Sequence, residues 1–339
     1  MFNNKIILIT GGTGSFGKYF CKYLVENFSP KKIIIFSRDE LKQREMFDNL
    51  SDKSKKLFRF FLGDIRDKER LCMAMQGSNY VVHAAALKQV DTGEYNPFEF
   101  IKTNINGSQN LIDSSLYNNV EKVIALSTDK AAQSTNLYGA TKLVSDKLFV
   151  SANNFKGSSK TKFSVVRYGN VADSRGSVIP IFKKLIKQNK NITLTDERMT
   201  RFWITLDQSI KFVMNSFRVM KGGEIFVPKL KSFRVIDLIK AFDNKLKIKK
   251  IGIRPGEKLH EVMCPKEEVQ NILEFKNYYV IYPSISYYMK NLYKLNLNKK
   301  LGKKVQIDFE YNSSDNKEFL TVNQLKMELK KLSINDNTL

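Results

Sequence analysis

Short apolar runs alternate with longer amphipathic stretches through the first half of the chain. Each run precedes a stretch of ten or more residues with helical periodicity. The runs are rich in Ile, Val and Phe and occupy residues 6–9, 33–36, 58–62, 80–82, 122–125 and 163–166. Continuous apolar runs are typical of strands buried on both faces, and their alternation with helices predicts parallel pairing. We therefore predict an α/β fold with a doubly wound parallel sheet.

The alternation loosens beyond residue 170, which indicates a second, smaller lobe. We predict that residues 1–172 form the main domain and that residues 205–245 return to it, because the apolar run 224–227 has the character of one more strand. Residues 173–204 and 246–339 are then expected to form the smaller, substrate-binding lobe and a C-terminal extension.

The charge balance is strongly basic, with 57 Lys and Arg against 34 Asp and Glu and a formal net charge of +23. Such an excess attracts polyanions, so a nucleic acid is one candidate partner. The lysines are scattered, however, and form only short runs such as residues 247–250, without interleaved aromatic residues. We therefore expect no nucleic-acid partner. The positive potential of the protein would also attract a small anionic substrate.

Cysteine and histidine are scarce and widely spaced, at Cys21, Cys72, Cys264, His83 and His260. This set predicts neither a disulfide framework nor a metal site. No apolar stretch reaches the ~18 residues that span a bilayer, and the first residues are too short for a signal peptide. We expect a cytoplasmic protein without a membrane partner.

A glycine-rich segment follows the first apolar run directly: residues 11–17 read Gly-Gly-Thr-Gly-Ser-Phe-Gly, and a helical pattern begins at Lys18. Glycines allow the backbone to approach a pyrophosphate, whose charge is held by free N–H groups at the helix start. The segment predicts a Rossmann-type dinucleotide site. The alternative is a glycine-rich turn without a ligand.

The second run ends in Ser37 and Arg38, where an NAD-specific site carries an acidic residue. A hydroxyl group and a guanidinium suit a 2′-phosphate, with Lys42 as a second cation, so NADP is favoured. Asp39 leaves open the alternative of a charged helix start. Asp64, after the third run, has two equal interpretations, an acceptor for the adenine amino group or a helix cap.

Four ionisable residues follow the fifth run. Tyr138 and Lys142, at i and i+4, lie on one helical face, where an ammonium would favour the phenolate that accepts a proton from a sugar hydroxyl. Asp129 and Lys130 lie at the carboxyl end of a parallel strand, where ligands bind. A surface ion pair or helix cap is the alternative for these two residues. To act as a base, Lys130 needs a pKa lowered by burial or by a neighbouring cation such as Lys142.

At these residues the chain resembles the inverting UDP-N-acetylglucosamine 4,6-dehydratases, which open the pseudaminic acid route. The resemblance covers nearly the whole chain. Its most specific stretches are residues 11–17, 37–43, 83–88, 127–142, 167–171, 200–203 and 253–261.

The resemblance implies a mechanism for dehydrating UDP-N-acetylglucosamine. Tyr138 would take the proton of the sugar 4-hydroxyl while NADP accepts hydride from carbon 4. Lys130 would remove the proton from carbon 5, Asp129 would protonate the departing 6-hydroxyl, and the hydride would return to carbon 6 with inversion at carbon 5. The product would be UDP-2-acetamido-2,6-dideoxy-β-L-arabino-hex-4-ulose.

The motifs and the resemblance together give the expected site. The catalytic residues are Asp129, Lys130, Tyr138 and Lys142. The cofactor-binding residues are Gly11, Thr13, Gly14, Ser15, Phe16, Gly17, Ser37, Arg38, Asp39, Lys42, Asp64, Ile65, Ala84, Lys88, Ser127, Tyr138 and Lys142. The substrate-binding residues are Lys88, Thr128, Asn170, Val178, Thr195, Arg201, Arg254 and Glu257. Residues 254–257 have the alternative of a turn with solvated charges.

The chain departs from the family's usual pattern at Gln89, at residues 133–134 and at Asp173, where His, Asn-Pro and Gly are usual. Two rival functions stay open: an NADP-dependent UDP-sugar epimerase or dehydratase/epimerase, and a non-catalytic NADP-binding regulator. The resemblance implies a homo-oligomer, either a dimer or a hexamer. The Tyr-rich pairs 278–279 and 287–288 are compatible with core, interface or lid roles.

Overall fold

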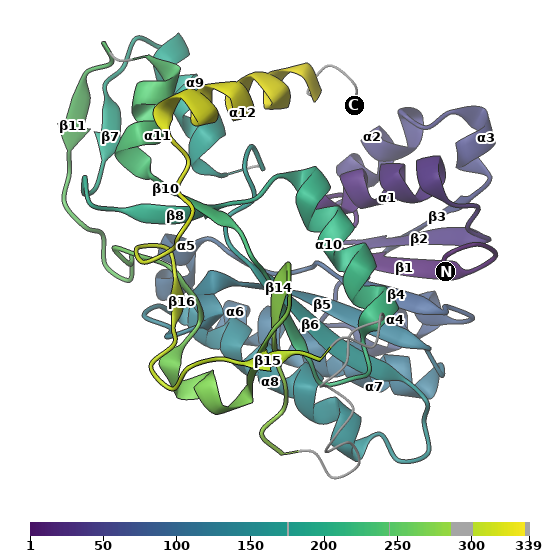
Figure 1. The fold of residues 1–339 in the computed structure, drawn as a ribbon. Helices are drawn as coiled ribbons and strands as arrows, with labels where there is room; N and C mark the ends of the chain where they lie inside the picture. Colours follow the sequence, from purple (N-terminus) through teal and green to yellow (C-terminus); the bar gives the residue numbers. More distant parts are fainter. Residues whose placement is uncertain (175, 244, 286–300, 336–339) are drawn as a thin grey trace.

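The described residues, 1–174, 176–243, 245–285 and 301–335, form a large sheet and a smaller lobe in the computed structural model (Figure 1). The strand order of the large sheet is β15-β13-β14-β9-β6-β5-β4-β1-β2-β3, and the strands from β9 to β3 run parallel to their neighbours. These strands are β1 (Ile6–Thr10), β2 (Lys32–Ser37), β3 (Phe58–Leu62), β4 (Tyr80–His83), β5 (Lys122–Thr128), β6 (Lys162–Tyr168) and β9 (Ile225–Pro228). The predicted doubly wound parallel sheet is confirmed, and each predicted run is one of its strands.

Successive residues of a strand face different layers of helices. Ile7 and Ile9 of β1 belong to one buried cluster with residues of α1 and α10, whereas Leu8 belongs to a second cluster with residues of α4, α7 and α8. Both faces of the sheet are therefore covered, which is why its strands are apolar throughout. These helices are α1 (Ser15–Asn27), α4 (Lys68–Met75), α7 (Gly107–Tyr117), α8 (Leu137–Phe155) and α10 (Leu206–Val219).

Antiparallel strands extend the sheet beyond β9. They are β14 (Tyr278–Ile281), β13 (Ile272–Glu274) and β15 (Lys303–Lys304). Tyr279 is buried in β14 and its ring contacts those of Phe309 and Tyr311, so this part of the tail has the core role. The pair at 287–288 lies outside the described residues. Among the described residues, no helix combines the length and the apolar character needed to cross a membrane.

The smaller lobe has its own core, built around residues such as Phe182, Trp203, Phe233 and Leu325. Figure 1 shows α9, α11 and α12 grouped beside β7 and β11, away from the parallel sheet. The elements of the lobe are α9 (Val178–Lys187), β7 (Ile192–Leu194), β8 (Thr200–Trp203), β10 (Lys231–Arg234), α11 (Val235–Phe242), β11 (Ile248–Lys250) and α12 (Val322–Asn335). A further small sheet pairs β12 (Val262–Cys264) with β16 (Tyr311–Asn312).

The structure departs from the expected division in two places. Residues 231–242 were expected to return to the main sheet, but β10 pairs with β8 and α11 packs in the core of the smaller lobe. Residues 272–281 were expected in the smaller lobe, but β13 and β14 extend the main sheet. The cause is that β10, β13 and β14 are only three or four residues long, so their residues give too short a pattern to indicate which strand each pairs with.

The remaining helical segments are short and connect the strands. They are α2 (Glu40–Asp48), α3 (Asp52–Lys55), α5 (Val90–Tyr95), α6 (Pro97–Phe100), the π-helical η1 (Ile101–Asn106) and the 3₁₀ segments η2 (Asp129–Ala131) and η3 (Lys266–Asn271).

A buried histidine at the end of β4 makes stability depend on pH. His83 bonds Thr10 Oγ1 through Nδ1 at 2.8 Å, and its burial, with Lys142 nearby, lowers its pKa from 6.5 to about 3. Between these values the unfolded chain binds a proton that the folded protein does not, so the free energy of unfolding falls as the pH falls through this window. Urea unfolding at a series of pH values should show this loss. A His83→Asn variant should show a shallower dependence, and an equal slope in both proteins would contradict the assignment.

Candidate active site

A cleft of about 870 Å³ opens at the carboxyl ends of the parallel strands, between the main sheet and residues 254–261. Its walls come from the segments that follow β1, β2, β4, β5 and β6. β1 lies between β2 and β4, so the chain crosses over in opposite directions on either side of it. Ligands of doubly wound sheets bind at this switch point.

The glycine-rich segment forms a cradle at the start of α1. Gly14 caps this helix without any side-chain bond, and its first turn holds no acidic residue, so no cap side chain or carboxylate competes with an anion at the helix start. A Cβ on Gly17 would lie 2.4 Å from Gly12 O, and a Cβ on Gly11, which has φ 65°, would lie 2.9 Å from the Ala85 backbone. The residues present therefore fit the pyrophosphate of a dinucleotide.

Replacing Gly17 with Ala should empty this cradle. The added methyl group overlaps the Gly12 backbone at 2.4–2.6 Å, so the turn must open and the N–H groups move off the pyrophosphate. The purified variant should contain at least tenfold less bound dinucleotide than the parent, measured by mass spectrometry of the denatured protein. Gly157→Ala is the control, because no atom lies within 4 Å of its added Cβ, although its φ of 56° strains the alanine. Equal dinucleotide content in both variants would refute the cradle.

The adenosine end of the cleft is bordered by Ser37, Arg38, Asp39 and Lys42. The Ser37 and Thr13 hydroxyls are 2.9 Å apart, which ties the end of β2 to the cradle. Asp39 accepts from Lys42 N at 2.9 Å as the cap of α2, and its other oxygen pairs with the Lys42 ammonium. The alternative of a charged helix start is thus confirmed, and the same residues also line the cleft.

Asp64 is held away from the cleft wall, although its neighbours Gly63 and Ile65 line it. Its carboxylate pairs with Arg66 at 2.7 Å and with Arg38 at 3.5 Å. The helix-cap interpretation is wrong, because Asp67 caps α4. A contact between Asp64 and adenine stays a prediction.

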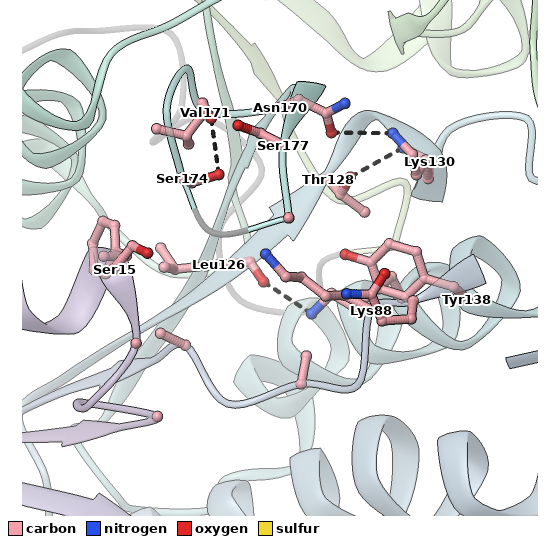
Figure 2. A pocket seen from close by; sticks show the side chains of 18 of the residues that line it. Ser15, Lys88, Leu126, Thr128, Lys130, Tyr138, Asn170, Val171, Ser174 and Ser177 are labelled. Atoms are coloured by element: carbon pink, nitrogen blue, oxygen red, sulfur yellow. Dashed lines mark hydrogen bonds between the residues drawn. The ribbon is translucent and has the colours of Figure 1, made fainter. Parts of the chain in front are cut away.

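The catalytic candidates converge where β5 ends and α8 begins (Figure 2). Lys130 Nζ donates to Asp129 Oδ1 at 3.1 Å, to Asn170 Oδ1 at 3.3 Å and to Glu261 Oε1 at 3.4 Å. Lys130 lines the cleft, whereas Asp129 is 1% exposed and lies behind it. The surface ion-pair alternative is therefore wrong for Asp129 and Lys130.

The structure contradicts the expected depression of the Lys130 pKa. Burial acts to lower this pKa, but the carboxylates of Asp129 and Glu261 outweigh burial and raise it above its ordinary value. Lys142 does not act on Lys130 here, since its ammonium donates to Leu126 O at 2.9 Å. In the ligand-free protein Lys130 is therefore an ammonium paired with carboxylates.

Tyr138 is buried in the cleft wall beside Lys130. Burial raises the pKa of Tyr138 to about 12, partly offset by the charge of Lys130 and a bond with the Thr128 side chain. Lys142 is not among the main causes of this pKa, and its ammonium donates to Leu126 O at 2.9 Å. The phenol is protonated at neutral pH.

The smaller lobe contributes cations to the opposite wall. Arg201 Nη2 lies 3.5 Å from Glu257 Oε1, and its guanidinium also donates to the carbonyls of Lys258 and Leu259 at 3.1 and 3.0 Å. Residues 254–257 form a turn, closed by Glu257 N donating to Arg254 O at 3.0 Å. The turn is confirmed, but its charges are not simply solvated, because its residues line the cleft and Glu257 Oε2 is buried.

Three expected site residues lie outside the cleft lining: Asp64, Asp129 and Thr195. Thr195 lines an adjoining apolar cavity of about 210 Å³, which shares Arg201 and Glu257 with the cleft. The other expected residues line the cleft: Gly11, Thr13, Gly14, Ser15, Phe16, Gly17, Ser37, Arg38, Asp39, Lys42, Ile65, Ala84, Lys88, Ser127, Thr128, Lys130, Tyr138, Lys142, Asn170, Val178, Arg201, Arg254 and Glu257. The individual contacts of these residues with ligands stay predictions.

Lys258 and Glu261 are among the charged residues of the wall that sequence reasoning missed. Both lie in the stretch 253–261 that carries the family resemblance, which was the available signal.

Of the departures, Gln89 lines the cleft, and Asp173 has φ 61° where the family's glycine would be unstrained. Lys183 holds Asp173 through an ion pair at 3.1 Å. The described residues contain no group of His, Cys, Asp or Glu suited to a metal ion.

The parallel sheet and the glycine cradle at its switch point give the chain a Rossmann-type dinucleotide-binding fold. The chain belongs to the family described as polysaccharide biosynthesis protein, which matches residues 7–283.

The chain is 55% identical to a UDP-N-acetylglucosamine 4,6-dehydratase (inverting) from Campylobacter jejuni, over 93% of this chain and 94% of the relative. It is 44% identical to a UDP-glucose 4-epimerase from Rickettsia bellii, over 83% of this chain and 84% of the relative. Among solved structures, Pen from Bacillus thuringiensis matches with a TM-score of 0.87 and 36% identity, covering 97% of this chain and 99% of that chain. A dTDP-glucose 4,6-dehydratase from Streptomyces venezuelae, solved with NAD and TYD bound, shares the fold with a TM-score of 0.66 and 20% identity, covering 75% and 86%.

Proposed function

We propose that the chain is an inverting UDP-N-acetylglucosamine 4,6-dehydratase that uses NADP. The observation that carries this proposal is the Asp129–Lys130 pair, 3.1 Å apart, in which Lys130 lines the cleft beside Tyr138 and Asp129 lies directly behind it. An enzyme that only oxidises and reduces carbon 4 needs one proton acceptor. A dehydratase needs a second base and an acid, and this pair supplies both.

The two residues of the pair exchange roles by moving one proton. Transfer from Lys130 Nζ to Asp129 Oδ1, over 3.1 Å, converts the ammonium and carboxylate into an amine and a carboxylic acid. The amine takes the proton from carbon 5, and the acid gives its proton to the departing 6-hydroxyl. The pair is then again an ammonium and a carboxylate: Lys130 holds the proton from carbon 5, and the proton that it passed to Asp129 has left with the 6-hydroxyl as water. As hydride returns to carbon 6, carbon 5 takes a proton from solvent on its opposite face, and Tyr138 releases the proton of the 4-hydroxyl to solvent.

Tyr138 accepts the proton of the sugar 4-hydroxyl in the first step. Its high pKa means that the phenolate forms only as it reacts, and the nearby charge of Lys130 stabilises it. A bound nicotinamide supplies the hydride acceptor for carbon 4 and the hydride donor for carbon 6. Arg201 and Arg254 would bind the diphosphate, which a guanidinium matches in geometry.

The choice of NADP rests on Ser37 and Arg38 at the end of β2, which offer a hydroxyl and a cation to a 2′-phosphate. Mass spectrometry of the nucleotide released from the purified protein distinguishes NADP from NAD. A homo-oligomer and a cytoplasmic location stay predictions.

The decisive experiment incubates the protein with UDP-N-acetylglucosamine in deuterated water, without added cofactor, and follows products by proton NMR. A 4-keto-6-deoxy sugar with the L-arabino configuration and deuterium at carbon 5 supports the proposal. Retained D-xylo configuration would remove the role given to Lys130. No turnover even with added NADP would favour the non-catalytic regulator.

The second candidate is a UDP-sugar 4-epimerase, favoured by the 44% identity to the Rickettsia bellii relative. In the same NMR experiment an epimerase would give a sugar that keeps its 6-hydroxyl and differs only at carbon 4.

A further inference from the structure

Lys130 has three acceptors, and one of them, Glu261, has no part in the reaction proposed above. Asp129, Asn170 and Glu261 accept from Nζ at 3.1, 3.3 and 3.4 Å. An ammonium has three N–H groups, so these acceptors use all of them and fix the direction of Nζ. Glu261 is 3% exposed and lies in the cleft wall.

The Glu261 carboxylate lies between two cations of the site. Its Oε1, the oxygen that accepts from Lys130, also lies 3.6 Å from Arg201 Nε. Its Oε2 is buried and has no hydrogen-bond partner among the described residues. A carboxylate is retained in such a position only when nearby cations compensate its burial, and Lys130 and Arg201 do so here.

The backbone of Glu261 is fixed by residues distant in the sequence. Glu261 N donates to Ser313 Oγ at 2.9 Å, and Ser313 N donates to Glu261 O at 2.8 Å. Ser313 Oγ also lies 3.1 Å from Thr200 O, next to Arg201. The C-terminal segment therefore sets the position of Glu261 relative to both cations.

We propose that Glu261 is a positioning residue that acts through Lys130, directing its Nζ and keeping it protonated until substrate enters. When Lys130 passes one proton to Asp129, the amine keeps two N–H groups. These N–H groups face Asn170 and Glu261, so Glu261 continues to direct the amine. This positioning role depends on the proposed function. The contact between Glu261 and Lys130 in the substrate-free protein does not.

The charged and titratable groups around Lys130 are Asp129, Glu261, Arg201 and Tyr138, with Lys88 and Lys258 on adjoining segments. Only Asp129 and Glu261 among them bring a negative charge at neutral pH. Replacing Glu261 with an uncharged residue leaves only the Asp129 carboxylate to stabilise the Lys130 ammonium. The Lys130 pKa then falls, and a larger fraction of Lys130 is neutral amine at a given pH.

The test compares Glu261→Gln with Glu261→Asp, which keeps the charge, and with Glu274→Gln, a surface carboxylate that pairs with Lys229. Trace acetic anhydride acetylates only the neutral amine, and mass spectrometry gives the rate at Lys130 in substrate-free protein. We expect Glu261→Gln to label about tenfold faster, which corresponds to about one pKa unit. Both other variants should label at the parent rate.

Turnover is the second readout. Glu261→Gln should lower kcat about tenfold with little change in KM, and Glu261→Asp should recover most of it. An unchanged labelling rate or an unchanged kcat in Glu261→Gln overturns the proposal. If Glu261→Gln does not fold, Arg201→Gln takes its place. Loss of this cation should raise the Lys130 pKa and slow the labelling of Lys130. Faster or unchanged labelling in Arg201→Gln would overturn the proposal. A parent protein that does not dehydrate refutes the proposed function, whereas the labelling comparison still decides the Glu261 contact.

Discussion

A Lys130→Ala variant should lose dehydration of UDP-N-acetylglucosamine by a factor of about 10²–10⁴, the usual contribution of a positioned proton acceptor. Tyr138 and the glycine cradle are untouched by this change, so the variant should still bind the dinucleotide and oxidise carbon 4. Substrate should therefore produce the near-ultraviolet absorbance of reduced nicotinamide, which persists because the later steps are blocked.

The control for this variant is Lys147→Ala, on the same segment of chain. Lys147 has a side chain that is 59% exposed and pairs with Glu268. It should turn over at the parent rate. Dehydration by Lys130→Ala within a few-fold of the parent would mean that another group removes the carbon 5 proton.

A Tyr138→Phe variant should lose activity by a comparable factor of about 10²–10⁴, but at the first step. The change removes only the hydroxyl group, so the packing of the buried ring is kept. Because the 4-hydroxyl then has no proton acceptor, substrate should produce no reduced nicotinamide. Stopped-flow absorbance separates this result from the accumulation expected for Lys130→Ala.

Tyr95→Phe is the matched control, since Tyr95 is 87% exposed. Accumulation of reduced nicotinamide in Tyr138→Phe would assign the first proton transfer to a different group.

The parallel sheet could be predicted because its strands carry their own signal. Each is a short run of β-branched and aromatic residues buried on both faces, and helices of regular periodicity separate them. The contact between Gly17 and Gly12 in the glycine cradle is equally local, since both residues lie within one turn. For these features, neighbours in the sequence are also neighbours in the fold.

The rest of the site depends on contacts that sequence spacing does not encode. Glu261 meets Lys130 across 131 residues, and its charge adds to that of Asp129 in raising the Lys130 pKa, which is opposite to the expected direction. The position of Lys142 depends on the Leu126 carbonyl, which no side-chain pattern indicates. The expected boundary at residue 245 also failed, because β10 pairs with β8, about 30 residues earlier in the chain.

The interleaving of the two lobes has a consequence for protein engineering. The core of the smaller lobe draws on residues 172–203, 233–241 and 320–329, and between these stretches the chain returns to the large sheet through β9 and β14. A hybrid enzyme that borrows this lobe from a relative would thus require several crossover points. With a single fusion junction, the smaller-lobe core of the hybrid would mix residues of the two parents. Recombination should therefore succeed only where all three stretches are exchanged together.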